Sequence, residues 1–464
     1  MRLVTDVNPA RIPGNQGDTG PLADRRVLVV GLGRFGGGVG VVRWLCGQGA
    51  DVRVTDRATA DSLKESINEI SDLPVRCHLG GHNISDLDDV ELVVLNPAVD
   101  KSRSALFRAI ADRQISWTTE INLFCERCRG QVIAVTGTYG KSTTCAMIAE
   151  ALRADRRGKE QTVGDVHLGG NIGGSLLPSL ERIDATDAVV LELSSAQLDD
   201  LPRVAWSPHI AVITNLYPHH LDRYADFSAY VESKLNVLGN GEPPGAIVVG
   251  ELHPGAEDLL LQRVHGFADR VVRVPLSAEA ITLGVPGAHN QRNAVCAVAV
   301  CARLSCDSAG VHAALRRFAG LEHRLEKVLT LDGVAYYNDS KSTSPPATIR
   351  AIEALGCPVV VIVGGQSKDV PLGDFGDALS RLCSTVVCTG ESGPTFAKAV
   401  RAASSGDHAP DVVEVVSPSD AVACARAAAT AGMAVLFSPG APSFDVYQNF
   451  ADRGRRFVEE LKAF

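Results

Sequence analysis

The chain has 464 residues, of which 45% are hydrophobic and 21% are charged, as is usual for a globular protein of two or three domains. Its net charge of −9 argues against general affinity for nucleic acid, so any anion site must be a local pocket. No apolar run approaches the roughly 18 residues of a membrane span, which argues against insertion into a membrane.

The start of the chain and its cysteines together indicate a cytoplasmic protein. The first twenty residues lack the apolar segment of a signal peptide, and we expect a flexible leader over residues 1–22. Most of the 12 cysteines lie in apolar or alanine-rich runs, which is typical of reduced core residues. Cys125 and Cys128 form the only C-x-x-C, and without a second pair a structural role is favoured over zinc.

A nucleotide-binding pattern begins at the first predicted strand, Arg26–Val30. The glycine-rich turn GLGRFG follows it, then a predicted helix from about Gly38 to Gly47 and a second strand that ends at Asp56. Glycines at a strand–helix turn, with an acid about twenty residues later, are typical of a dinucleotide fingerprint. The pattern predicts that a nucleotide or pyrophosphate binds at this turn, without saying which.

The sequence TGTYGKS forms a predicted phosphate loop between a buried strand, Val132–Val135, and a helix that continues to Ala151. The strict template G-x-x-x-x-G-K-[ST] would need glycine where Val135 stands, so this is a shorter form. Glycines let backbone N–H groups approach a polyphosphate, Lys141 can reach the terminal phosphates, and the Ser142 hydroxyl can bind Mg²⁺. The alternative is an ordinary strand–helix turn with a surface lysine.

Polar side chains follow two later strands of the same region. Glu192 lies near the end of the buried strand Ala188–Leu193, where a carboxylate is costly unless it is paired or bound to metal. The strand Ile210–Thr214 should lie beside the phosphate-loop strand, and this favours a site role for His219 or His220 over a solvated pair.

Two helices of this region also carry polar candidates. Lys234 lies on the predicted helix Ala229–Leu238, where spacing alone indicates a solvated surface lysine. The polar stretch Gly287–Asn293 opens the apolar helix Ala294–Leu304, and its N-terminal end is a natural position for a ligand.

A second doubly wound unit is predicted towards the C-terminus. Its strands end in loops rich in glycine, serine or lysine, with helices between them, which places basic and hydroxyl groups at the carboxyl edge of a sheet. The predicted strands are Val334–Tyr337, Pro358–Val363, Thr385–Cys388 and Ala434–Phe437.

Taken together, these stretches resemble the Mur ligase family over nearly the whole chain after the leader. Each motif alone is weak, but they occur in family order and at family-like separations. The first glycine turn and the short first domain look most like the branch that adds D-glutamate. The motifs are GLGRFG, TGTYGKST, GGNIG, LELSSAQL, HHLDRY, AYVESKL, GAHNQRNA, GLEHRLE, NDSKST and SPGAPSFDVYQNFADRG.

The resemblance implies an α/β protein of three domains. These are a Rossmann-like N-terminal domain for a UDP-sugar at residues 23–125, a central P-loop ATPase-like domain at 126–319, and a Rossmann-like glutamate ligase domain at 320–464. The implied activity is ATP-dependent addition of D-glutamate to UDP-N-acetylmuramoyl-L-alanine through an acyl phosphate, in peptidoglycan precursor synthesis. ATP, Mg²⁺ and these two substrates are the implied partners of a monomeric enzyme.

The resemblance also implies a role for each motif residue, with Lys141, Lys234 and His220 as catalytic groups. ATP would meet Gly137, Thr138, Gly140, Lys141, Ser142, Thr143, Asn290, Asn293, Arg324 and Asp339. Mg²⁺ would be held by Ser142, Glu192, His220 and a carbamate on Lys234. The UDP-sugar substrate would meet Gly31, Gly33, Arg34, Phe35, Asn171, Ser194 and Gln197, and D-glutamate would meet Lys341, Thr343, Ser443 and Phe450.

The chain departs from the family pattern at several positions. Tyr139 stands in the phosphate loop where the family usually has asparagine, and Ala196 replaces an aromatic residue. Asn96-Pro97-Ala98 replaces a more usual Ser-Pro-Gly, and uridine diphosphate contacts would fall on Arg34, Phe35 and Arg57.

Three rival functions remain open at this stage. A nucleotide-dependent oxidoreductase would rest on the first glycine turn and Asp56, but it leaves the phosphate loop unexplained. Another ligase of the same family, such as an L-glutamate-adding or folylpolyglutamate synthase-like enzyme, is a closer rival. The third is a nucleotide-binding scaffold without catalysis.

Overall fold

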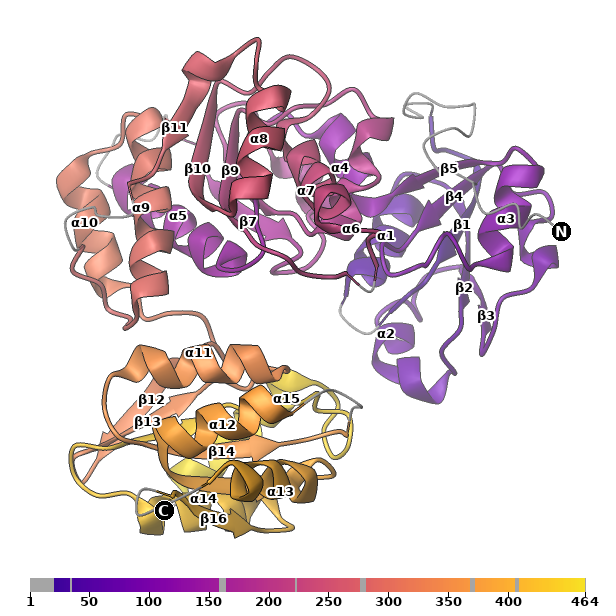
Figure 1. Cartoon of the computed structure of the whole chain (residues 1–464). Helices are drawn as coiled ribbons and strands as arrows, with labels where there is room; N and C mark the ends of the chain where they lie inside the picture. The colour runs from indigo at the N-terminus through magenta and orange to yellow at the C-terminus, as the bar shows by residue number, and fades with distance from the viewer. Residues whose placement is uncertain are drawn as a thin grey trace, which may run out of the picture. The chain divides into compact units, whose positions relative to one another are not determined.

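A computed structural model describes residues 21–33, 36–157, 164–221, 223–275, 281–367, 372–404 and 409–463. These residues form three β-sheets with helices between the strands, as Figure 1 shows, which confirms the predicted three-domain α/β architecture. The chain divides into two compact units, Met1–Ala280 with Arg292–Ala314, and Ile281–Gln291 with Leu315–Phe464. No helix in the described part of the chain is long and apolar enough to cross a membrane.

The N-terminal sheet is parallel, with strand order β3-β2-β1-β4-β5. Alternate residues of β1 and β4 face two separate apolar layers, because successive side chains of a strand point to opposite faces. The strands are β1 (Arg26–Val30), β2 (Asp51–Asp56), β3 (Arg76–Leu79), β4 (Leu92–Leu95) and β5 (Ser116–Thr119). The helices are α1 (Gly37–Gly47), α2 (Lys64–Asn68), α3 (Ala105–Asp112) and α4 (Glu120–Arg127).

The central sheet is also parallel, with order β11-β10-β9-β6-β8-β7. As predicted, β9 lies beside β6, the strand that leads into the phosphate loop. The strands are β6 (Gln131–Thr136), β7 (Val166–Gly170), β8 (Ala188–Glu192), β9 (Ile210–Leu216), β10 (Ala246–Leu252) and β11 (Val271–Arg273). The helices are α5 (Lys141–Arg156), α6 (Ser195–Leu198), α7 (Phe227–Leu235), α8 (Pro254–Arg263), α9 (Ala288–Arg303) and α10 (Ser308–Arg317).

The C-terminal sheet has order β12-β13-β17-β14-β15-β16, in which β12 pairs antiparallel with β13 and the other pairs are parallel. Its helices α11, α12 and α13 pack on one face, and α14 and α15 pack on the other. The strands are β12 (Glu326–Leu331), β13 (Val334–Asn338), β14 (Val359–Gly364), β15 (Cys383–Thr389), β16 (Asp411–Glu414) and β17 (Ala434–Phe437). The helices are α11 (Pro345–Leu355), α12 (Gly373–Leu382), α13 (Gly393–Ala403), α14 (Pro418–Ala428) and α15 (Phe450–Lys462).

Candidate active site

The phosphate loop connects β6 to α5. Its two glycines, Gly137 and Gly140, are required because neighbouring atoms leave no room for a side chain at either position. A Cβ atom at Gly137 would lie 2.1 Å from Thr214 Oγ1, and one at Gly140 would lie 2.2 Å from Asn293 Oδ1. Both glycines also have positive φ, 149° and 78°, a backbone region that other residues rarely adopt. The loop can therefore approach its neighbours, and a ligand, more closely than any loop with side chains at these positions.

The end of β9 holds the phosphate loop in place. The backbone N–H of Thr138 donates to the Asn215 carbonyl at 2.9 Å, and that of Tyr139 donates to Asn215 Oδ1 at 2.9 Å. Lys141 Nζ lies over the same loop and donates to the carbonyls of Gly137 and Thr138, each at 3.0 Å. The lysine ammonium is thus already positioned at the N-terminus of α5, where the helix dipole also favours an anion.

Helix α9 meets the phosphate-loop helix through a predicted nucleotide residue. Thr144 Oγ1 donates to Asn293 Oδ1 at 3.3 Å, and both residues are buried. Ser142 is also buried, and Thr143 is half-buried. Asn290 belongs to the other compact unit, where its amide donates to the Pro286 carbonyl at 2.6 Å.

Glu192 ends β8 in register with Val135, the residue that precedes the loop, and it is only 1% exposed. The Asn171 side-chain amide donates to Glu192 Oε1 at 2.9 Å, and the Asn171 N–H donates to the Glu192 carbonyl at 2.9 Å. Among the described residues, Glu192 Oε2 has no hydrogen-bond partner. A buried carboxylate oxygen without a partner is costly, so this atom suits a bound cation.

Lys234 is buried against the end of β6, the strand that leads into the phosphate loop, rather than solvated as its spacing alone would indicate. It is 2% exposed, and its Nζ donates to Thr136 Oγ1 at 3.1 Å. Burial places the pKa of the Lys234 amine well below its usual value, and repulsion by Lys141 acts in the same direction against the opposing attraction of Glu192 and Asp199. These effects favour a neutral amine.

Aromatic contacts connect the phosphate loop, the two histidines and α7. The rings of Tyr139 and His219 lie edge to face at 5.6 Å between centroids, and those of His219 and His220 at 4.1 Å. His220 lies 6.2 Å from Tyr230, whose hydroxyl donates to Thr138 Oγ1 at 3.1 Å. His220 is exposed and has φ of 55°, a strained backbone for a non-glycine residue.

Ser194 and Gln197 cap the short helix α6. Ser194 Oγ accepts from the Gln197 N–H at 3.3 Å, and Gln197 Oε1 accepts from the Ser194 N–H at 2.9 Å and from its hydroxyl at 2.8 Å. Their polar atoms are therefore engaged in a capping box, a structural role that sequence reasoning did not anticipate.

Asp56, the acid of the dinucleotide fingerprint, hydrogen-bonds to the first glycine turn and closes it. Asp56 Oδ2 accepts from the Gly33 N–H at 3.0 Å, and Asp56 Oδ1 accepts from the Ala58 N–H at 2.8 Å. A Cβ atom at Gly31 would lie 2.8 Å from Asn96 Cβ, so the departure at Asn96 packs directly against this turn. Arg34 and Phe35 lie outside the described residues, and Arg57 is exposed.

In the C-terminal unit, Asp339 is buried at the end of β13. Its Oδ1 accepts from the Leu325 N–H at 3.0 Å and its Oδ2 from the Ser438 hydroxyl at 2.7 Å. Burial raises the pKa of the Asp339 carboxyl to about 6, against the lowering effect of these hydrogen bonds and of the Arg324 charge. Arg324 and Asp339 are thus electrostatically coupled.

The predicted glutamate residues lie on two loops and one helix start: Lys341 and Thr343 lie between β13 and α11, Ser443 follows β17, and Phe450 begins α15. Lys341 Nζ lies 4.9 Å from the centre of the Phe450 ring, so the structure brings these two together. Ser443 is buried and Thr343 is exposed.

Arg453 is a residue that sequence reasoning missed. It is 1% exposed and donates to the Ser340 hydroxyl and carbonyl at 3.1 and 2.8 Å, and to the carbonyls of Ala441 and Pro442, each at 3.0 Å. One guanidinium therefore joins the loop that carries Lys341 to the loop that carries Ser443. Its position three residues after Phe450, inside a quoted motif, was the available signal.

Comparison with known proteins places each sheet in a described domain type. Residues 25–116 match the family model of the Mur ligase MurD-like N-terminal domain. Residues 135–262 match the Mur ligase middle domain, and residues 323–440 match the Mur ligase glutamate ligase domain. A solved UDP-N-acetylmuramate-alanine ligase from Thermotoga maritima has a TM-score of 0.60 at 21% identity, covering 94% of this chain and 99% of its own. At this identity, the likeness establishes a shared fold.

Full-length relatives are more similar in sequence. The UDP-N-acetylmuramoylalanine–D-glutamate ligase of Symbiobacterium thermophilum is 35% identical over 465 residues, covering 94% of this chain and 98% of the relative. The enzyme of the same name from Roseiflexus sp. is 34% identical, covering 96% of this chain and 99% of the relative.

Proposed function

This chain belongs to the Mur ligase family, and we propose that it is an ATP-dependent ligase that joins D-glutamate to UDP-N-acetylmuramoyl-L-alanine in peptidoglycan precursor synthesis. The observation that carries the proposal is the phosphate loop, with Lys141 over its backbone and the buried Glu192 in register with its strand. The names of the full-length relatives support the choice of substrates.

The proposed reaction converts a carboxylate into an electrophile in two steps. The alanine carboxylate attacks the γ-phosphorus of ATP, which forms an acyl phosphate and releases ADP. The glutamate amine then attacks the acyl carbon, a C–N bond forms, inorganic phosphate leaves and the nitrogen loses a proton. Lys141 would exchange its two carbonyl acceptors for phosphate oxygens, because charge-assisted hydrogen bonds are the stronger ones.

A magnesium ion fits the residues near Glu192. Glu192 Oε2 is buried and has no hydrogen-bond partner among the described residues, so it suits a hard cation; Ser142 and His220 are the further proposed ligands. In the described ranges, no three His, Cys, Asp or Glu side chains form a ready-made metal cage, so ligands would come from single side chains and from the phosphates. When bound, the metal supplies charge neutralisation for the transferring phosphoryl group.

Lys234 would supply its metal-binding oxygens as a carbamate. A neutral amine is the form that reacts, because its lone pair attacks the carbon of CO₂, forms a C–N bond and then loses a proton. Burial of Lys234 favours that neutral form, and the anionic product would remove the repulsion between Lys234 and Lys141. Its oxygens are the hard ligand type that Mg²⁺ prefers.

The acceptor glutamate would lie in the C-terminal unit. Lys341, held beside Phe450, would pair with a carboxylate of glutamate, with Thr343 and Ser443 as hydroxyl donors. We place the enzyme in the cytoplasm, acting as a monomer.

The geometry of the first turn gives Asp56 a structural role, which weakens the oxidoreductase alternative. In dinucleotide sites, the acid after the second strand binds ribose hydroxyls, whereas both oxygens of Asp56 accept backbone N–H groups.

Phosphate release from the purified chain tests the proposal. With ATP, Mg²⁺ and UDP-N-acetylmuramoyl-L-alanine, D-glutamate should support turnover and L-glutamate should not. Turnover with L-glutamate alone would assign the chain to an L-glutamate-adding ligase. Turnover with a folate and glutamate would support a folylpolyglutamate synthase-like activity, and no turnover with any acceptor would favour a non-catalytic scaffold.

A further inference from the structure

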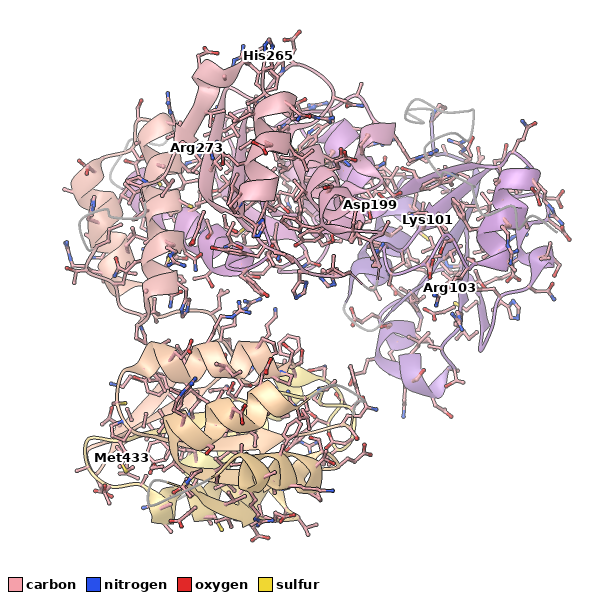
Figure 2. All side chains as sticks on the ribbon, viewed as in Figure 1. Lys101, Arg103, Asp199, His265, Arg273 and Met433 are labelled. Carbon is pink, nitrogen blue, oxygen red and sulfur yellow. The ribbon has the colours of Figure 1, made fainter. Side chains whose placement is uncertain are left out.

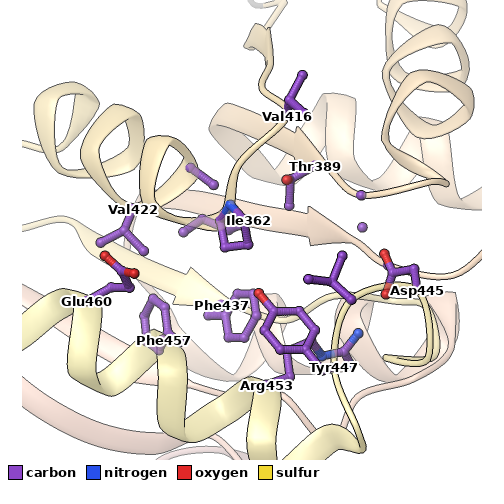
Figure 3. A pocket seen from close by; sticks show the side chains of 16 residues that line it. Ile362, Thr389, Val416, Val422, Phe437, Asp445, Tyr447, Arg453, Phe457 and Glu460 are labelled. Atoms are coloured by element: carbon purple, nitrogen blue, oxygen red, sulfur yellow. The ribbon is translucent and has the colours of Figure 1, made fainter.

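The hollow between α14 and α15 in the C-terminal unit, which Figure 3 shows, is too small for an organic ligand. Its volume is about 30 Å³, which is room for about two water molecules. Reactive side chains that the proposed ligation does not use lie instead in the central domain, where α9 ends and α10 begins. Cys301 lies in the last turn of α9 and Cys306 in the link to α10, both as thiols.

Cys301 and Cys306 occupy the two positions that a helix C-terminal cap brings together. The Cys306 N–H donates to the Cys301 carbonyl at 3.0 Å, and the Ser305 N–H donates to the Ala302 carbonyl at 3.1 Å. Ser305 has φ of 57°, the left-handed backbone that this cap requires. The two bonds define a Schellman motif, in which the residues joined by the longer loop commonly pack their side chains against each other.

The two thiols are in contact, and they differ in access to solvent. Cys301 is buried, whereas Cys306 is half-buried and can meet a small reagent. The hydrogen bond with Cys306 raises the pKa of the Cys301 thiol, as do burial and the negative charges of Cys306 and Asp155, so Cys301 keeps its proton. A disulfide needs Cα atoms within roughly 7 Å and side chains that point together. The backbone hydrogen bond and the thiol hydrogen bond supply these two conditions.

The end of α5 holds this contact in place and provides a cation. Asp155 Oδ1 accepts from the Asp307 N–H at 2.8 Å, and Asp307 itself caps the start of α10. Burial lowers the pKa of the Arg156 guanidinium, and the attraction of Asp187, and then of a Cys306 thiolate, opposes that lowering. Because the attraction is mutual, Arg156 stabilises the thiolate, which is the nucleophilic form of cysteine.

We propose that Cys301 and Cys306 form a thiol–disulfide exchange site, at which oxidised glutathione or a similar small disulfide reversibly joins the two residues. The Cys306 thiolate attacks one sulfur of the small disulfide, a mixed disulfide forms, and one small thiolate leaves. Cys306 then carries no negative charge, so Cys301 loses its proton more easily and its sulfur attacks that of Cys306. The Cys301–Cys306 bond forms and the second small thiolate leaves, so two protein thiols are oxidised while one disulfide is reduced. The proposed ligation uses neither thiol, so the site is independent of that function.

Peptide mapping of the full chain after incubation with oxidised glutathione tests the site. The remaining thiols are alkylated, and trypsin then cuts after the arginine that ends α9, which places Cys301 in the peptide 293–303 and Cys306 in the peptide 304–316. Only a disulfide holds these two peptides together. We expect the linked pair in the folded chain, and we expect dithiothreitol to separate it. A folded chain that yields no linked pair would overturn the proposal and leave the two cysteines a packing role.

Three variants assign the roles of the two thiols. Cys301→Ala should stop at the mixed disulfide, so the peptide 304–316 should carry one glutathione and the linked pair should fall about tenfold or more. Cys306→Ala should leave Cys301 unmodified, because the remaining thiol is buried. Cys296→Ala, which removes the other buried cysteine of the peptide 293–303, is the matched control and should form the link as the unmodified chain does. A link that survives Cys301→Ala, or glutathione on Cys301 in folded Cys306→Ala, would end the proposal, and the map of the unmodified chain tests it even if a variant fails to fold.

Discussion

Buried ionisable side chains at the site are in states that a bound ligand would change. Glu192 keeps one carboxylate oxygen without a partner among the described residues, Lys234 is held towards its neutral form, and burial raises the pKa of Asp339 to about 6. Each arrangement costs free energy in the protein alone, and each would be relieved by charge of the right sign. Substitution of these residues should therefore change activity without a matching loss in the free energy of unfolding.

Lys141→Ala should keep the fold and lose turnover. The lysine makes two hydrogen bonds to loop carbonyls, which contribute little to stability, whereas its charge would act on the transferring phosphoryl group. We expect a loss of about 3 kcal/mol of transition-state stabilisation, roughly a hundredfold in phosphate release. Lys398→Ala, an exposed lysine on α13, is the control. Near-normal turnover in folded Lys141→Ala would contradict the phosphate-loop assignment.

Lys234→Ala should lose activity, and acetate should restore part of it by occupying the place of the carbamate. Lys234→Arg should fail as well, because arginine stays charged and cannot form a carbamate. Nuclear magnetic resonance of the unmodified chain in ¹³C-bicarbonate should show a carbamate signal that is missing from Lys234→Arg. A fully active Lys234→Arg enzyme would rule the carbamate out.

At the scale of elements, a buried carboxyl group lies where α4 meets the segment after β7. Glu120, the first residue of α4, accepts a 2.7 Å hydrogen bond from the Ser175 hydroxyl. A Cβ atom at Gly40 on α1 would lie 2.7 Å from Ser175 Cβ, so α1 closes the other side of this contact. Burial raises the pKa of the Glu120 carboxyl to about 7, and the Ser175 hydrogen bond opposes the rise.

This pKa predicts that the free energy of unfolding falls as pH rises. Above about pH 4.5 the unfolded chain has lost the Glu120 proton, while the folded chain keeps it until about pH 7. Between pH 6 and 8, urea unfolding should show a loss of about 1 kcal/mol. Glu120→Gln should flatten that slope, whereas Glu353→Gln, on the exposed side of α11, should not. An unchanged slope in Glu120→Gln would contradict the assignment.

At the scale of the molecule, a buried ion pair joins the first two sheets. Lys101, from the loop after β4 and labelled in Figure 2, donates to Asp200 Oδ2 at 2.7 Å, with both side chains nearly buried. Lys101 and Arg203 both lie against the Trp117 ring, at 5.6 and 3.7 Å from its centre. Burial raises the pKa of Asp200, and the attraction of Lys101 opposes that rise.

Replacing one residue of this ion pair should lower the free energy of unfolding more than replacing both residues. Asp200→Ala leaves the Lys101 ammonium buried and unpaired, and urea unfolding should show a loss of about 3–5 kcal/mol. The double variant Lys101→Met/Asp200→Leu should recover most of it, because neither charge of the pair is then left without the other. Asp88→Ala, which breaks the exposed pair with Arg113, should change little. A double variant as unstable as Asp200→Ala would refute this account.

The sequence predicted the parts of the fold that have local signals. Strands such as β1 and β17 are apolar and bounded by turns, and their bounds were predicted correctly, whereas β3 and β16 are short and half exposed and were missed. Site features that depend on distant partners left no local pattern. The use of Asp56 to close a turn depends on tertiary packing, and the motif around Phe450 contains Arg453 without revealing that it joins two loops.

The supports of the phosphate loop have a consequence for synthesis on the ribosome. Tyr139 is held by Asn215, 76 residues later, and Thr144 meets Asn293, 149 residues later. β6 also pairs with β8 and β9, both of which are translated after it. A nascent chain that stops before Asn215 has the loop sequence without its scaffold. We therefore expect nucleotide affinity to appear only once most of the central sheet has left the exit tunnel, so ATP should not act as a folding template for the growing polypeptide.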